Sequence, residues 1–242
     1  MPQKFTELWV YLATTPLLGL TITLLTYQAA YWLYRRGNFN PLLNPVALSV
    51  AALVLLLLAS GTPYETYFDG AKFVHFLLGP ATVALAIPLY SQMNKLKQML
   101  LPLLAALLAG AATAIISAVG IGWLLGASQE TLLSLAPKSV TTPIAMGIAE
   151  KLGGIPSLTA VLVIFTGISG AIMAKSILDM LRIDNHAVRG FSVGIAAHGI
   201  GTARAFQVSE QAGAFAGLAM GLNGLTTALI TPLLLKLLGF LT

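Results

Sequence analysis

The sequence predicts an all-α polytopic membrane protein of about six to eight membrane segments, two of them interrupted or re-entrant as in transporters. Of its 242 residues, 57% are hydrophobic and 9% are charged, whereas about a quarter are charged in ordinary soluble domains. The apolar runs are long and do not alternate with polar residues, unlike the strands of an outer-membrane barrel. Two polar, broken stretches lie between these runs. Lipid tolerates broken backbone only where protein or a water-filled cavity satisfies its polar groups.

The composition also argues against several classes of function. There is no cysteine, which excludes disulfides and thiolate chemistry. The net charge of +5 is spread over segment ends, as the positive-inside rule expects, and does not indicate nucleic-acid binding. No zinc-binding His-Glu-x-x-His, nucleophile elbow or Walker loop occurs. We therefore expect no enzyme, cofactor or metal site, and a multi-pass protein in the cell inner (plasma) membrane.

The first half of the chain is expected to hold four membrane segments of one domain that covers 1–242. Arg35-Arg36 ends the first segment on the cytoplasmic side, and this segment is long enough to be retained rather than cleaved. The stretch 61–70 carries acids and aromatics but no Lys or Arg, which predicts an external loop. Gly79-Pro80 predicts that the third segment is kinked or discontinuous. These segments are 8–34, 46–60, 72–90 and 99–125.

The second half contains both interrupted segments. Pro137 and Pro143 bracket the first, because each proline removes a backbone donor and clashes with the preceding turn. If this segment re-enters rather than spans, Arg182 and Arg189 fall on the cytoplasmic side, so re-entrance is favoured. The last segment is expected to be one tilted helix or two pieces. The expected segments are 137–152 (interrupted), 155–181, 190–206 (interrupted) and 212–241.

Internal repetition is weak in the sequence. Ser139-Val140 and Ser192-Val193 each open an interrupted segment, and such pairs point to the midplane site of a transporter. A shift of 57 positions aligns Val83 with Val140, Ile87 with Ile144 and Gly110 with Gly167.

The first interrupted segment is the candidate for binding a small anion. Lys138 supplies a positive charge, and Ser139, Thr141 and Thr142 supply hydroxyl groups. A half-helix beginning there would also point backbone donors and its positive dipole end at a ligand, for which a compact carboxylate is the natural choice. Alternatively, Lys138 extends to a lipid head group.

The second interrupted segment contributes a second set of candidates. His198 and Arg204 lie nearly two helical turns apart, so they are expected on roughly similar faces. Arg204 is suited to bidentate carboxylate binding and His198 to a hydrogen bond or a coupled proton. Alternatively, Arg204 is an interfacial anchor and His198 bonds a carbonyl group. Gly199 and Thr202 complete this set, although the glycines there also fit close helix packing.

Two secondary candidates are weaker. Glu150 is expected to be interfacial beside Lys151, with a proton relay as the alternative. Asn223 lies inside an apolar run, where an amide more often bridges helices than binds a ligand.

The chain resembles the LrgB/CidB family of membrane proteins over nearly its whole length after Asn40. The resemblance rests on Leu42-Leu43-Asn44-Pro45, Leu78-Gly79-Pro80-Ala81-Thr82-Val83-Ala84-Leu85-Ala86-Ile87-Pro88-Leu89-Tyr90, Pro137-Lys138-Ser139-Val140-Thr141-Thr142-Pro143-Ile144-Ala145, Gly153-Gly154-Ile155-Pro156 and Ala197-His198-Gly199-Ile200-Gly201-Thr202-Ala203-Arg204.

This resemblance implies a smaller LrgA/CidA-like membrane partner and two rival functions. Plant relatives exchange glycolate and glycerate, and some bacterial pairs are linked to pyruvate uptake. The older label is holin-like or antiholin-like, meaning control of murein hydrolase activity and programmed cell death. The broken polar segments favour transport of small monocarboxylates. A regulatory subunit remains a third class, and contacts with lipid and a homo-oligomer are also expected.

Overall fold

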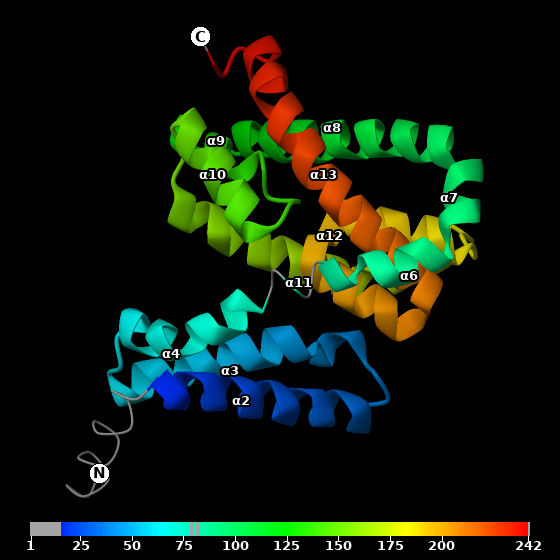
Figure 1. Ribbon diagram of the computed structural model, residues 1–242. Coiled ribbons are helices and arrows are strands. Elements are labelled where there is room, and N and C mark those ends of the chain that lie inside the picture. Colours follow the sequence, from blue (N-terminus) through cyan, green and yellow to red (C-terminus); the bar gives the residue numbers. More distant parts are fainter. Residues whose placement is uncertain (1–15, 78–79, 81–82, 242) are drawn as a thin grey trace, which may run out of the picture. The chain divides into compact units, whose positions relative to one another are not determined.

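The computed structural model of the protein describes residues 16–77, 80 and 83–241, and the regular structure within them is helical. The chain divides into two compact units, Met1–Ala84 and Leu85–Thr242, which are described separately with the helix labels of Figure 1. Three helices of the described residues are long and apolar enough to cross a membrane. The predicted all-α class is thus confirmed, and the chain is a multi-pass membrane protein.

The first unit packs α2 (Pro16–Arg36) against α3 (Pro45–Ser60) and α4 (Tyr64–Phe76), with a 3-10 turn, η1 (Pro41–Leu43), before α3. α2 and α4 approach closely, since a Cβ on Gly19 would lie 2.5 Å from the carbonyl oxygen of Tyr67. Asn44 caps α3 by accepting hydrogen bonds from the next backbone N–H groups, and Pro45 fits the first turn, where no backbone donor is needed. This cap explains the Asn44-Pro45 motif.

The external loop predicted over 61–70 is wrong from Tyr64 onward, because α4 begins there. Glu65 lies in the first turn, where a carboxylate favours a helix. The rings of Tyr64 and Phe68, one turn apart, stack at 5.6 Å between centroids. Aromatic pairs one turn apart stabilise a helix. The aromatic residues that suggested a loop at a membrane interface therefore fit a helix equally.

Two predicted segments in the first half extend outside the described residues. The start of 8–34 does so, and the described helix begins at Pro16. The segment 72–90 is divided between α4, which ends at Phe76, and α6, which begins at Ala86. Residues 78–79 and 81–82 of the motif between them lie outside the described residues.

The second unit contains the three candidate spans and both interrupted segments. α13 runs unbroken through Pro232 and is therefore one helix. The helices are α6 (Ala86–Ser91), α7 (Met93–Gln98), α8 (Leu100–Leu124), α9 (Gln129–Leu135), α10 (Thr142–Leu152), α11 (Pro156–Met180), α12 (His186–Val208) and α13 (Glu210–Leu237).

Hairpin 1 consists of α9, the turn 136–141 and α10. Its helices have 7 and 11 residues, well short of the roughly 20 that a span requires. After α10 the chain returns to α9, because the backbone N–H of Ile155 donates to Ser134 Oγ at 2.7 Å. Thr159 Oγ1, in the first turn of α11, donates to the carbonyl oxygen of Ser134 at 3.1 Å. This geometry is that of a re-entrant hairpin.

Hairpin 2 is α12 itself, which folds back at His198. The backbone there has φ 40° and ψ −133°, outside the helical region. Gly201 lies against Val193, since a Cβ on Gly201 would be 2.8 Å from Val193 Cγ1, whereas eight residues of straight helix span about 12 Å. The first arm is 186–197 and the second arm is 199–208. The break lies inside the stretch predicted to be interrupted.

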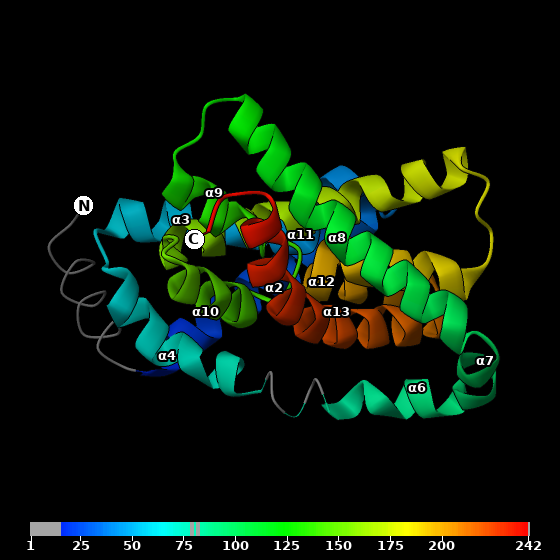
Figure 2. The ribbon, with the colours of Figure 1, turned by 90° about the horizontal axis from the view of Figure 1, so that it is seen from above.

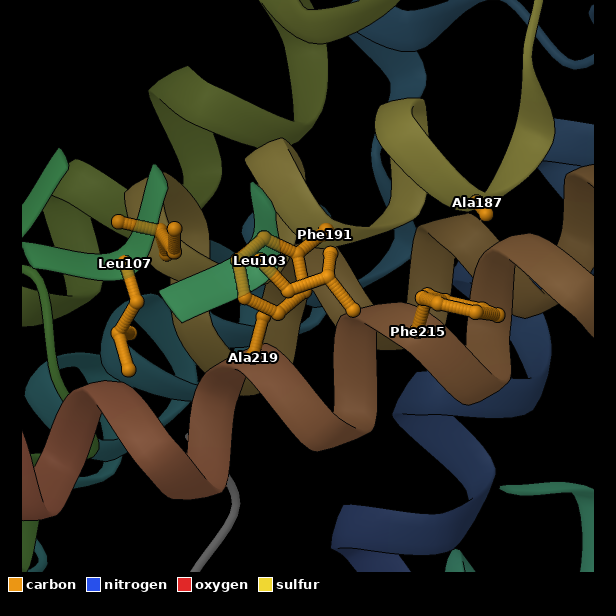
Figure 3. Close-up of a cluster of buried hydrophobic side chains, with 7 residues drawn as sticks. Leu103, Leu107, Ala187, Phe191, Phe215 and Ala219 are labelled. Carbon is orange, nitrogen blue, oxygen red and sulfur yellow. The ribbon is translucent and has the colours of Figure 1, made fainter. Parts of the chain in front are cut away.

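The first arm of hairpin 2 runs alongside the first half of α13. A Cβ on Gly190 or Gly194 would collide with the carbonyl oxygens of Ala212 or Ala216, so glycine is what allows the two backbones to approach. Side chains from α8, the first arm and α13 form one core beside this contact (Figure 3). This core comprises Leu103, Leu107, Ala187, Phe191, Ile195, Phe215 and Ala219.

A long helix precedes each hairpin, and this pair of elements repeats along the chain. α8 and α11 have 25 residues each and lie 56 positions apart, 100 to 156 and 124 to 180. Hairpin 1 covers 129–152 and hairpin 2 covers 186–208, a spacing of 57 and 56. Because hairpin 1 returns the chain to the end at which α8 finishes, α11 runs back and the repeat is inverted. The weak sequence repeat at 57 has this structural counterpart.

Basic residues gather at one end of the second unit, which we call the basic end. Leu96 and Met99, before α8, pack against the core cluster that includes Ala187, at the start of hairpin 2. Lys95, Lys97, Arg182 and Arg189 therefore lie at that end. At the opposite end, Gln129 Nε2 donates to the carbonyl oxygen of Phe240 at 3.0 Å, which brings the chain after α13 beside α9 (Figure 2). The positive-inside rule predicts that the basic end faces the cytoplasm.

Candidate functional site

Asn223, near the middle of α13, joins the two hairpins. Its Nδ2 donates to the carbonyl oxygen of Ser139 at 3.3 Å and to that of Ile195 at 3.1 Å. Its Oδ1 lies 3.4 Å from Thr227 Oγ1, which donates to it. Carbonyl groups beside a helix break lack a helical partner. The buried amide of Asn223 supplies a donor to one such carbonyl group in each hairpin. Asn223 therefore bridges helices, as its place in an apolar run suggested.

Lys138 and Ser139 occupy the tip of hairpin 1. Lys138 is half-buried and its Nζ donates to Ser139 Oγ at 3.3 Å, which uses one of its three hydrogens. Thr141 precedes α10 with no side-chain capping bond, and Thr142 is the first residue of the helix. Both threonines are half-buried. The structure thus brings the lysine, the hydroxyl groups and the start of α10 into one short turn.

Two cavities meet at Lys138, one on each side of the first arm of hairpin 2. A cavity of about 550 Å³ lies between this arm and α11, and one of about 450 Å³ lies between the arm and α8. Lys138, Ser192 and Ala196 line both cavities. The cavities are largely apolar, with polar groups where they meet.

Lys138 has no carboxylate partner within the described part of the chain. The ion pairs found there are Lys72–Asp69 and Arg189–Asp179. A half-buried ammonium facing cavities inside a membrane protein is costly without an opposite charge. The site is therefore electrostatically matched to a small anion. The described residues contain no group of three His, Asp or Glu side chains suited to a metal ion.

His198 is used at the tip of hairpin 2. Its Nε2 lies 2.9 Å from the carbonyl oxygen of Val163 in α11, which makes that nitrogen the protonated donor. Thr202 Oγ1 donates to the carbonyl oxygen of His198 at 2.8 Å, and both side chains are buried. Gly199 lies close to the sulfur of Met220. These contacts hold the fold of the tip, and ligand binding by His198, Gly199 and Thr202 stays a prediction.

Arg204 lies on the second arm, away from Lys138. It lines a separate cavity of about 220 Å³ with Lys175 and Arg189, and its Nη1 donates to Gln207 Oε1 at 3.0 Å. The spacing that predicted similar faces for His198 and Arg204 assumed a continuous helix, but the break at His198 intervenes. Glu150 is exposed near the end of α10, at the far end of hairpin 1 from Lys138.

Sequence reasoning missed four hydroxyl residues that line the two cavities. Thr166 and Ser169 of α11 line the larger one and Thr113 of α8 the smaller one, while Ser192 lines both. Their only sequence signal is a single hydroxyl in a long apolar run, which usually bonds a carbonyl of its own helix. Ser192 carried the further signal of opening an interrupted segment.

Comparison with known proteins places the chain among membrane proteins of one family. The chain is 38% identical to the uncharacterized protein YwbG of Bacillus subtilis over 91% of this chain and 97% of the relative. It is 29% identical to the holin-like protein CidB of Staphylococcus epidermidis, covering 91% and 96% of the two chains. It is 29% identical to the antiholin-like protein LrgB of Bacillus cereus, covering 93% and 98%. No solved structure matches the chain.

The family match covers both hairpins and most of both units. The LrgB-like family matches residues 23–237, which include Lys138, His198 and Asn223. The resemblance stated from the motifs is confirmed, and two of the three relatives bear the names of holin-like and antiholin-like proteins. This chain belongs to the LrgB-like family.

Proposed function

We propose that the protein carries small monocarboxylates of the pyruvate, glycolate or glycerate class across the inner membrane, together with an LrgA-like partner. The observation that supports this most is Lys138. It stands at the tip of a broken hairpin, lines two cavities and has no carboxylate partner among the described residues. A monocarboxylate supplies the missing single negative charge and accepts hydrogen bonds from the ammonium group.

The inverted repeat supports the same proposal. In transporters with inverted repeats, the substrate site lies near the midplane, where broken segments of the two repeats meet. Here the tips of both hairpins meet at Asn223. The ammonium of Lys138 and the hydroxyls of Ser139 and Ser192 are the proposed carboxylate contacts.

The names of the relatives favour a second function, a holin-like or antiholin-like regulator of murein hydrolase activity and programmed cell death. The comparisons support this function more directly than carboxylate transport, because relatives that match most of the chain carry these names. A lesion former needs apolar helices that associate, and it has no requirement for an unpaired lysine at a hairpin tip. Lys138 therefore distinguishes the two functions.

Uptake into liposomes that contain the full chain and its LrgA-like partner tests the proposal. We expect uptake of labelled pyruvate, glycolate or glycerate, and Lys138→Met is expected to lower it by at least about tenfold, because a charge-assisted hydrogen bond contributes about 1.5–3 kcal/mol. Lys151→Met is the matched control, since it removes an exposed lysine at the other end of the same hairpin.

The two functions predict opposite results for leakage. Carboxylate transport predicts that trapped dyes much larger than pyruvate stay inside the liposomes. Leakage of such dyes at the same rate in the wild-type chain and in Lys138→Met would contradict the transport proposal and support the holin-like function.

A further inference from the structure

The cavity that contains Arg204 has a different chemistry from the two cavities at Lys138. Its volume is about 220 Å³, and it lies between the last turns of α11 and both arms of hairpin 2, with Ala212 of α13. Three cationic side chains line it, and no acidic residue is among the described residues that line it. They come from three different segments: Lys175 from α11, Arg189 from the first arm and Arg204 from the second arm.

The two arginines are held in place by the protein itself. Arg189 Nη2 pairs with Asp179 Oδ1 at 2.7 Å, its Nη1 donates to the carbonyl oxygen of Ile183 at 3.0 Å, and its side chain is 17% exposed. Arg204 bonds Gln207 through Nη1. Asp179, the partner of Arg189, is 48% exposed and does not line the cavity. Positive charge converges on the cavity from side chains that are already oriented.

The location fits the boundary between lipid and water. Lys175 lies near the end of α11. Arg189 lies near the start of α12 and Arg204 near its end, and both ends lie on the same side because α12 folds back at His198. The cavity therefore opens at the basic end. The rest of its lining is aliphatic or glycine, including Leu178, Val193 and Val208. Basic pockets between membrane helices at the cytoplasmic side suit anionic head groups, and guanidinium groups bind phosphate oxygens in pairs.

We propose that this cavity binds a phosphate-bearing anion, either the head group of an anionic phospholipid or free phosphate. Such an anion contacts α11 and both arms of hairpin 2 at once, and its binding ties the hairpin to α11. This assignment is independent of the proposed transport function, because it uses none of the residues at Lys138. It gives Arg204 a ligand of different chemistry from the carboxylate that the sequence suggested.

Thermal unfolding of the purified full chain in a neutral detergent tests this site. Phosphatidylglycerol is expected to raise the apparent Tm by about 3 °C or more over the same amount of phosphatidylcholine, because a ligand that binds only the folded state stabilises it. Lys175→Gln combined with Arg204→Gln is expected to abolish most of this rise. Lys95→Gln combined with Lys97→Gln is the matched control, since it removes the same charge at the same end without altering the cavity lining.

The remaining arms separate the two sources of phosphate. If inorganic phosphate raises the apparent Tm and phosphatidylglycerol does not, the site binds free phosphate. If phosphatidylglycerol raises the Tm and inorganic phosphate does not, the site binds the lipid head group. Lys175→Gln alone, at an exposed side chain, keeps the test valid if the double variant does not fold, and it is expected to reduce the rise. The proposal would be overturned by equal Tm values in both lipids without a response to phosphate. It would also be overturned if the double variant and its control lost the same share of the rise in Tm.

Discussion

Hairpins 1 and 2 hold equivalent places in the inverted repeat, but their tips are built differently. Hairpin 1 turns through several residues, and the side chain of Lys138 is directed to two cavities rather than to a carboxylate of its own chain. Hairpin 2 reverses at His198 alone, whose ring bonds α11 and whose carbonyl oxygen accepts from Thr202. The ring Nε2 and the carbonyl oxygen of His198 thus both have partners within the protein. The difference teaches that a broken membrane segment is no binding site by itself, since binding needs a polar group left for a ligand.

The packing of the arms shows the same difference. Hairpin 2 is pressed against α13 through glycines, and a Cβ on Gly194 would collide with the carbonyl oxygen of Ala216. In α10 of hairpin 1, a Cβ on Gly147 would meet no atom within 4 Å. Hairpin 2 is therefore a fixed part of the core, whereas one face of hairpin 1 is open.

Gly194→Ala is the substitution expected to have the largest effect on stability. The added methyl group meets backbone, which cannot move aside without displacing α13, so a loss of about 2–3 kcal/mol or more is expected. Gly147→Ala is the matched control and is expected to be neutral or to stabilise by up to about 1 kcal/mol through helix propensity. Thermal unfolding of both variants in detergent measures the contrast. Equal Tm values for the two variants would show that the arms do not differ in packing.

Asn223→Leu is expected to have the next largest effect. It keeps the approximate shape of the side chain but leaves the carbonyl oxygens of Ser139 and Ile195 without this donor, and each buried unsatisfied group costs about 1–3 kcal/mol. Thr227→Val is the control, because it removes only the longer 3.4 Å bond to Asn223, and a smaller loss is expected. The melting temperature measures the stability of each variant. Uptake measured below that temperature shows whether transport requires the bridge between the two hairpin tips. A similar Tm for Asn223→Leu and the wild type would contradict the bridging role.

Much of this arrangement was accessible from the sequence, because prolines and long apolar runs act locally. Pro137 and Pro143 marked hairpin 1, and the charge rule favoured its return to the starting side. The break at His198 was less accessible, since no proline marks it and the residue with positive φ is His198 rather than a neighbouring glycine. Ser192 and Thr166 line the same cavity from different helices, and this proximity depends on the tertiary fold.

Substitutions at His198 give the smallest expected effect and the sharpest test of the second tip. With φ at 40°, glycine adopts this backbone at little cost and alanine does not. His198→Gly and His198→Ala both lose the bond to Val163, so we expect the glycine variant to be more stable by about 1 kcal/mol, the reverse of the order inside a helix. Ala205→Gly, in the second arm, is the control and is expected to show the ordinary helical order, with alanine the more stable. His198 is not among the residues that line the two cavities at Lys138, so uptake by His198→Gly should stay close to the wild-type rate, unlike uptake by Lys138→Met. If His198→Gly instead lowered uptake as far as Lys138→Met does while its Tm was unchanged, His198 would contact the substrate, and the distinction between the two tips would fail.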